Sequence, residues 1–134
     1  AHQFAEGDVL HWWHESLHLG ARTTFSDDYL WLVYVTYQYI KVTGDKAILS
    51  EGVSFCQAEA LSPEENERCI TYKSGEWGSP NGDRASLYEH LKRAMNRAMS
   101  RQGAHGLPLM GCGDWNDGMS AVGVEGRGES VWEL

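Results

Sequence analysis

The sequence has 134 residues and a formal net charge of −8 at pH 7, which limits it to about one domain of ordinary size. So acidic a chain lacks the basic surface that nucleic-acid phosphates require, and nucleic-acid binding is not expected. No apolar run is long enough to span a membrane, and no secretory leader is expected within this stretch. The three cysteines have no C-x-x-C spacing, which favours reduced thiols and a cytoplasmic protein.

The first predicted helix begins at Ser26, a good N-cap, and its body runs over residues 29–42. Thr43 and Gly44 supply the stop signal. Apolar side chains surround this helix on nearly all sides, which predicts burial on more than one face.

The second predicted helix extends from Ser86 to about Gln102. Ser86 and Glu89 form the S-x-x-E pattern of a capping box. Apolar residues follow one stripe of this helix with basic residues opposite, and Gly103 ends it.

The remaining segments, residues 1–25, 51–85 and 104–128, are predicted to be loops, because none shows sustained strand alternation. The expected fold class is therefore all-α, with long active-site loops at one end of the helices. A further helix is predicted to begin at Glu129, and it stops without a cap. Residues 1–134 are accordingly expected to be a fragment, truncated at both ends.

The string His14-Glu15-Ser16-Leu17-His18 matches the H-E-x-x-H motif of zinc peptidases. On a helix it would place two imidazoles one turn apart, with Glu15 as a base. However, no third ligand completes the longer motif, and Gly20 would stop a helix just after His18. The favoured interpretation is an ordinary polar loop with no metal, and the zinc peptidase remains an alternative.

The loop Gly113-Asp114-Trp115-Asn116-Asp117-Gly118 is the strongest candidate for catalysis. A carboxyl that serves as an acid needs a raised pKa, which an apolar wall or a neighbouring carboxylate provides. Trp115 offers the wall and Asp114 the charge. A calcium loop fits poorly, because Gly118 falls where a ligand belongs.

A third group joins Arg22, in a loop, to Asp28, on the first turn of the first predicted helix. A guanidinium and a carboxylate at the opening of one binding site are strong hydrogen-bond partners for sugar hydroxyls. A simple helix cap with a surface ion pair is the alternative. If all these groups serve one site, loops 7–25 and 104–128 converge.

Five strings together resemble glycoside hydrolase family 94, the inverting disaccharide and oligosaccharide phosphorylases. They are G-D-V-L-H-W-W-H, R-T-T-F-S-D-D-Y-L-W-L, S-L-Y-E-H-L-K-R-A, H-G-L-P-L-M-G-C-G-D-W-N-D-G-M and G-R-G-E-S-V-W, and they span most of residues 7–134. The resemblance implies that the chain is part of an α/α six-hairpin barrel. The β-1,2-glucan members are the most similar.

The resemblance also implies roles for individual residues. Asp117 is the general acid, Trp115 lines the subsite of the transferred sugar, and Arg22 and Asp28 hold that sugar's hydroxyls. We expect Asn116 to bind sugar, and Asp114 to orient the loop or to bind sugar hydroxyls. The family's main phosphate-binding residues lie beyond this sequence, so the fragment alone is expected to be inactive.

The expected function is inverting phosphorolysis of β-glucosidic bonds in oligoglucans, with release of α-glucose 1-phosphate. The β-1,2 linkage is favoured. The expected partners are a β-glucan oligosaccharide and inorganic phosphate, with no cofactor, and the full-length protein is expected to be a homo-oligomer. The first alternative is a region of a membrane cyclic β-1,2-glucan synthase that controls chain length. A non-catalytic sugar-binding module is a further alternative.

Overall fold

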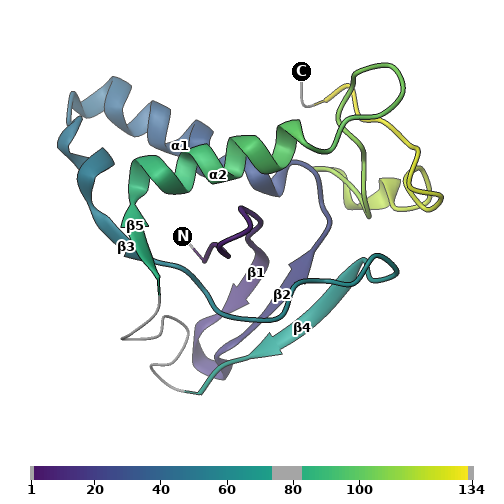
Figure 1. Ribbon diagram of the computed structural model, residues 1–134, viewed down its shortest axis with the longest axis horizontal. Helices are drawn as coiled ribbons and strands as arrows, with labels where there is room; N and C mark the ends of the chain where they lie inside the picture. The colour runs from purple at the N-terminus through teal and green to yellow at the C-terminus, as the bar shows by residue number, and fades with distance from the viewer. Residues whose placement is uncertain (1, 74–82, 133–134) are drawn as a thin grey trace.

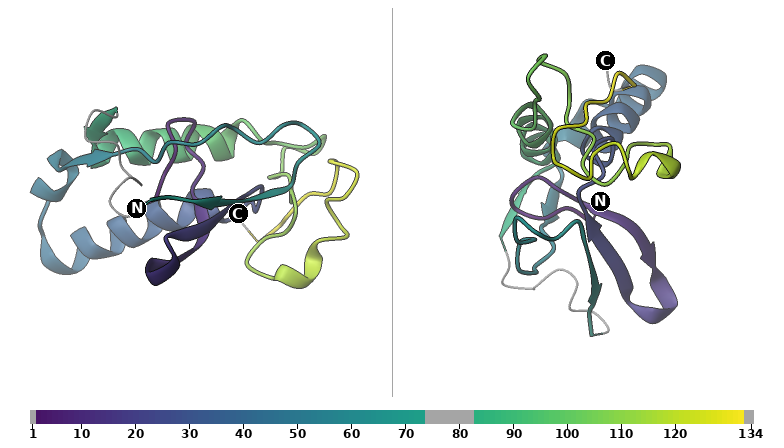
Figure 2. Two further views of the ribbon diagram at one scale, coloured as in Figure 1. Left: turned by 90° about the horizontal axis from the view of Figure 1, so that it is seen from below. Right: turned by 90° about the vertical axis from the view of Figure 1, so that its right-hand side faces the viewer.

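The computed structural model describes residues 2–73 and 83–132. Within them, two antiparallel helices, α1 (Asp28–Thr43) and α2 (Leu87–Met99), form one layer. A three-stranded antiparallel sheet, ordered β1 (Leu10–His14), β2 (Leu19–Thr23) and β4 (Glu67–Thr71), lies on one side of them (Figure 1). The long segment after α2 gathers at the end of the molecule where α2 ends and α1 begins (Figure 2).

The expected all-α fold is wrong, because the structure combines helices with two small antiparallel sheets. Residues 10–23, expected to be a loop, form the hairpin of β1 and β2 around the short 3-10 helix η1 (Glu15–Leu17). His18 closes this turn in the left-handed region, at φ 47°. Because a histidine and not a glycine occupies this position, the sequence shows none of the usual signals of a hairpin turn here.

The second expected loop, residues 51–85, also contains strands. β4 pairs with β2 from Leu19↔Thr71 to Thr23↔Glu67. β3 (Gly52–Ser54) pairs with β5 (Arg84–Ser86), and the 3-10 helix η2 (Ala47–Ser50) precedes them. These strands are short and their partners are distant in the chain, so local sequence patterns identify them poorly. Residues 74–82 of this segment lie outside the described residues.

Local sequence signals predict two helix ends correctly and a third to within a few residues. The backbone N–H of Glu89 donates to the Ser86 hydroxyl oxygen at 3.2 Å, which confirms the predicted cap of α2. Gly44, at φ 74°, donates its N–H to the Ile40 carbonyl at 2.8 Å and ends α1 as predicted. α2 ends at Met99, a few residues earlier than expected.

The start of α1 differs from the prediction. Its N-cap is Asp27, whereas the Ser26 hydroxyl donates to the Gly113 carbonyl at 3.0 Å. The side chain expected to cap the helix therefore holds a distant loop against it. The helix expected from Glu129 is also absent from the described residues, where Glu129 instead forms a β-bridge with Leu109.

The buried apolar cluster lies against the three-stranded sheet and contains Phe4, Leu10, Cys56 and Tyr72. By contrast, α1 buries only Tyr29 and Thr36, so the prediction that it is buried on several faces is wrong for this chain. Its exposed apolar side chains are Trp31, Tyr34, Val35, Tyr37, Tyr39 and Val42. Neither helix of the described chain is long and apolar enough to cross a membrane.

Candidate active site

The predicted catalytic loop is attached to the start of α1. The backbone N–H and the hydroxyl of Ser26 both donate to the Gly113 carbonyl, each at 3.0 Å. The Cys112 N–H donates to the Thr24 hydroxyl oxygen at 3.2 Å. Residues 24–26 and 112–113 are thus side by side, which confirms the predicted convergence of the two loops at this point.

Gly111 lies at this junction, and the close approach of its backbone to that of Thr24 explains why the residue is a glycine. A Cβ at Gly111 would lie 1.9 Å from the Thr24 carbonyl oxygen, and Gly111 has φ 62°. Any other side chain would collide with Thr24 and strain the backbone. The glycine therefore lets the loop reach the residues that precede α1.

Within the loop, Asp114 makes structural bonds. Its Oδ1 accepts from the Asn116 N–H at 2.9 Å, and its Oδ2 accepts from the Ser130 hydroxyl at 2.8 Å. The Asn116 Oδ1 accepts in turn from the Gly118 N–H at 3.1 Å, which caps the 3-10 helix η3 (Asp117–Met119). The buried Asp114 carboxylate thus orients the turn from which Asp117 emerges.

Asp117 is the first residue of η3, and its side chain lies outside the described part of the structure. Trp115, two residues earlier, is 59% exposed, and its ring contacts Trp132 with 5.2 Å between the centroids. An exposed aromatic face of this kind can stack on the apolar face of a sugar ring. The sequence analysis did not identify Trp132, because only the fold brings it beside Trp115.

Asp28, the first residue of α1, has a largely buried carboxylate that two side chains contact. His11 Nδ1 lies 3.1 Å from Oδ1 and 3.2 Å from Oδ2, and the Thr23 hydroxyl donates to Oδ2 at 3.2 Å. Burial raises the pKa of Asp28, while the hydrogen bond from His11 acts in the opposite direction. Neither His11 nor Thr23 was identified as a site residue from the sequence.

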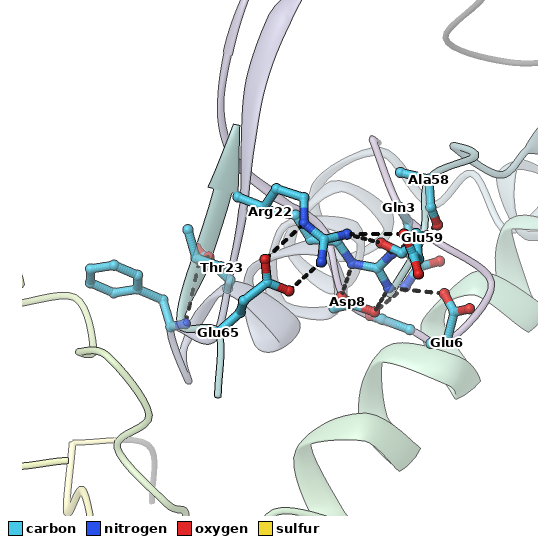
Figure 3. A network of polar contacts seen from close by, with 12 residues as sticks. Gln3, Glu6, Asp8, Arg22, Thr23, Ala58, Glu59 and Glu65 are labelled. Atoms are coloured by element: carbon cyan, nitrogen blue, oxygen red, sulfur yellow. Dashed lines mark hydrogen bonds and ion pairs between the residues drawn. The ribbon is translucent and has the colours of Figure 1, made fainter. Parts of the chain in front are cut away.

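Arg22, on β2, is the centre of a separate polar network (Figure 3). Its Nε and Nη2 donate to the two oxygens of Asp8 at 2.6 and 3.0 Å, and Nη2 also donates to Glu6 at 3.0 Å. Its Nη1 donates to the carbonyls of Ala58 and Glu59, each at 3.1 Å. All five N–H groups therefore have partners, and the pKa of Arg22 is raised by Asp8 and Glu6 despite burial.

Arg22 and Asp28 consequently belong to two different networks. Arg22 is 1% exposed, and of its two carboxylate partners the Asp8 side chain is 3% exposed and the Glu6 side chain 49% exposed. The Glu6 bond is the one that a ligand could replace most easily, because Asp8 is buried with the guanidinium.

The H-E-x-x-H string does not form a helix. His14 ends β1, residues 15–17 form η1, and His18 occupies the turn. The two imidazoles are therefore not one turn apart on a helix face, as the zinc motif requires. Among the described residues, no cluster of three His, Cys, Asp or Glu side chains could hold a metal ion.

The loop that carries Asp117 therefore lies beside the exposed ring of Trp115 and is attached to the helix start that carries the largely buried carboxylate of Asp28. The chain belongs to the glycosyl hydrolase 94 superfamily, since the model of that family's catalytic domain matches residues 1–133. Family membership places the G-D-W-N-D-G loop in a catalytic domain and accounts for the five sequence strings.

Several relatives are similar over most of the chain. Cyclic beta-(1,2)-glucan synthase NdvB of Rhizobium meliloti (strain 1021) is 47% identical over 132 residues, 98% of this chain and 4% of that protein. Solabiose phosphorylase of Paenibacillus borealis is 30% identical over 81% of this chain and 11% of its own length. Cellobionic acid phosphorylase of Neurospora crassa is 29% identical over 80% of this chain and 10% of its own length. The chain thus spans only a small part of each relative.

Proposed function

We propose that this chain is part of a phosphorolytic domain acting on β-1,2-glucan, within a protein of the cyclic β-1,2-glucan synthase type. The observation that carries this proposal is the 47% identity to NdvB over nearly the whole chain. It favours the synthase over a free oligoglucan phosphorylase, which was the first expectation. The domain's role in such a protein would be to control the length of the glucan chain.

The proposed reaction needs one carboxylic acid. A phosphate oxygen attacks C1 of the terminal glucose, and the bond from C1 to the glycosidic oxygen breaks with inversion. Asp117 gives its proton to that leaving oxygen. An inverting hydrolase needs a second carboxylate to activate water, but phosphate is already ionised near neutral pH. The products are α-glucose 1-phosphate and a shortened glucan, and the reaction is reversible.

The contacts of Asp114 support this division of roles. Asp114 and Asp117 are only three residues apart in the sequence, too close to act from opposite faces of a sugar ring. Asp114 is engaged by Asn116 and Ser130, which suits a residue that positions the loop. The proton transfer is therefore assigned to Asp117, the residue that the family resemblance implies.

The sugar-binding roles remain with Trp115, Asp28, Asn116 and Arg22. The exposed ring of Trp115 provides a stacking surface, and the carboxylate of Asp28 is a hydrogen-bond acceptor for hydroxyls. Asn116 uses its carbonyl oxygen to cap η3, which leaves its amide N–H groups to meet a hydroxyl. Arg22 can bind a hydroxyl if the sugar replaces Glu6 on Nη2.

A free disaccharide phosphorylase is the second candidate. The similarity to solabiose phosphorylase and cellobionic acid phosphorylase over about four-fifths of the chain supports it. The two candidates differ in acceptor length. The synthase-type domain should release glucose 1-phosphate from long β-1,2-glucan chains, whereas a free phosphorylase of this second kind should prefer disaccharides.

The decisive variant is Asp117→Asn in the whole protein. Asparagine keeps the size of the side chain but cannot donate the proton. General acid catalysis contributes about 10²- to 10⁴-fold, so turnover with β-1,2-glucan should fall by at least the lower figure. Turnover of an aryl β-glucoside with a good leaving group should fall less, because its leaving oxygen needs less protonation.

Asp114→Asn is the matched control on the same loop, and its effect on turnover should be milder. Normal turnover in Asp117→Asn with an inactive Asp114→Asn would reverse the two roles. If neither variant loses turnover, the proposed mechanism is wrong. Sugar binding without any phosphate-dependent turnover in the wild type would instead indicate a binding module.

A further inference from the structure

His11 occupies an irregular position on β1. The register between β1 and β2 shifts between Leu10 and Trp12, so His11 lies at a β-bulge. Bulges turn a side chain away from the direction that regular alternation would give it. Here the half-buried imidazole meets the start of α1, seventeen residues away in the sequence.

One side of the His11 interaction is polar. Nδ1 lies within 3.2 Å of both oxygens of Asp28. An ionised carboxylate only accepts hydrogen bonds, so Nδ1 is the donor. A donor shared by both oxygens fixes the plane of the carboxylate, and the Thr23 hydroxyl adds a second donor to Oδ2.

The other interaction of His11 is aromatic. Its ring is stacked on Phe25 with 4.2 Å between the centroids and 10° between the planes. The Phe25 ring is packed against the catalytic loop, since a Cβ on Gly113 would lie 2.5 Å from Phe25 Cε1. The Gly113 carbonyl is bound by Ser26, the residue after Phe25. A continuous series of contacts therefore joins the Asp28 carboxylate to the loop that carries Asp117.

We propose that His11 is a positioning residue that holds the substrate-binding carboxylate of Asp28 and the catalytic loop in one geometry. The inference rests on the proposed function, since it assigns His11 a role in that same site. Its Nδ1 sets the orientation of Asp28, and its ring, through Phe25, sets the position of residues 113–117. The two tasks use different parts of one side chain, so two substitutions separate them.

His11→Phe keeps an aromatic ring for Phe25 but removes the donor to Asp28. Without that donor the Asp28 carboxylate can turn away from the orientation that meets the sugar, and the loss of one hydrogen bond to a charged group corresponds to about 10-fold or more. We expect the KM for β-1,2-glucan, and for α-glucose 1-phosphate in the reverse reaction, to rise by that factor. The KM for phosphate and kcat should change much less.

His11→Asn has the opposite effect. Its Nδ2 can replace the imidazole Nδ1 as donor to Asp28, but the stack on Phe25 is lost. A loop displaced by about 1 Å can reduce catalysis by about 10²-fold, so kcat should fall by 10-fold or more while the sugar KM stays near the wild-type value. Phe25→Leu removes the same stack without altering the bulge and should reproduce this result.

The experiment measures both constants for these variants in the whole protein, with His14→Phe as the matched control. His14 is an exposed residue of the same strand and should leave both constants unchanged. Equal changes of kcat and KM in His11→Phe and His11→Asn, or wild-type values in both, would overturn the inference. If the His11 variants fail to fold, an unchanged kcat in Phe25→Leu overturns it.

Asp117→Asn, measured in parallel, separates this inference from the proposed function. If Asp117→Asn and Asp114→Asn both keep wild-type turnover, the proposed function fails. If Asp117→Asn is inactive while the His11 and Phe25 variants match the His14→Phe control, only the role of His11 is refuted.

Discussion

The contact between Gly113 and Phe25 allows a quantitative prediction for Gly113→Ala. The new Cβ would lie 2.5 Å from Phe25 Cε1 and 3.1 Å from Cδ1. Ordinary carbon contacts are about 3.5–4.0 Å, so the ring and the loop must separate by about 1 Å. The ring cannot withdraw freely because His11 is stacked on it. The loop must therefore supply most of the movement.

A displacement of that size should be visible in catalysis. Misplacing a catalytic group by about 1 Å can cost about 10²-fold, so kcat should fall 10- to 100-fold in Gly113→Ala. Overpacking also destabilises folded proteins by about 1–3 kcal/mol, which lowers the thermal midpoint. The sugar KM should change less, because Asp28 and Arg22 keep their own contacts.

The assay is release of α-glucose 1-phosphate from β-1,2-glucan by the whole protein, at a temperature at which the variants are folded. Gly52→Ala is the matched control, since the nearest atom to its new Cβ would be 3.5 Å away. The double variant Gly113→Ala with Phe25→Leu tests the cause: the two effects should be less than additive, because the smaller side chain relieves the collision. A folded Gly113→Ala protein with wild-type kcat would refute the reasoning.

Three further predictions concern pH, metal and the isolated chain. Burial lowers the pKa of His90 from 6.5, so the His90 imidazole binds a proton more weakly in the folded state than in the unfolded chain. Its contribution to stability is thus present above pH 6.5 and lost as the pH falls below it. The thermal midpoint of the whole protein should drop between pH 7 and pH 5, and by less in His90→Gln; equal drops would contradict this origin. EDTA should leave phosphorolysis unchanged, since His14 and His18 flank a hairpin turn; loss of activity restored by zinc would show the opposite. Residues 1–134 expressed alone should bind a hydrophobic dye and aggregate through the exposed apolar side chains of α1, whereas a monodisperse chain that leaves the dye unbound would show that this face needs no cover.

Some features of this protein follow from the sequence alone, because their causes are local. The Ser86–Glu89 cap and the Gly44 stop involve residues within one helical turn of each other, and both occur as predicted. Five motifs in the right order indicate the family, and the match of the family model over residues 1–133 shows that the chain belongs to it. These signals do not depend on what packs against them.

Other features required the tertiary structure, because their causes are distant in the chain. β2 obtains its second neighbour, β4, from residues more than forty positions away, so local patterns alone predict a loop for the hairpin segment and an all-α fold. Ser26 does not cap α1, since the Gly113 carbonyl provides a partner that no local pattern reveals. The same holds for His11, whose bulge, stack and carboxylate partner come from three segments that only the folded chain brings together.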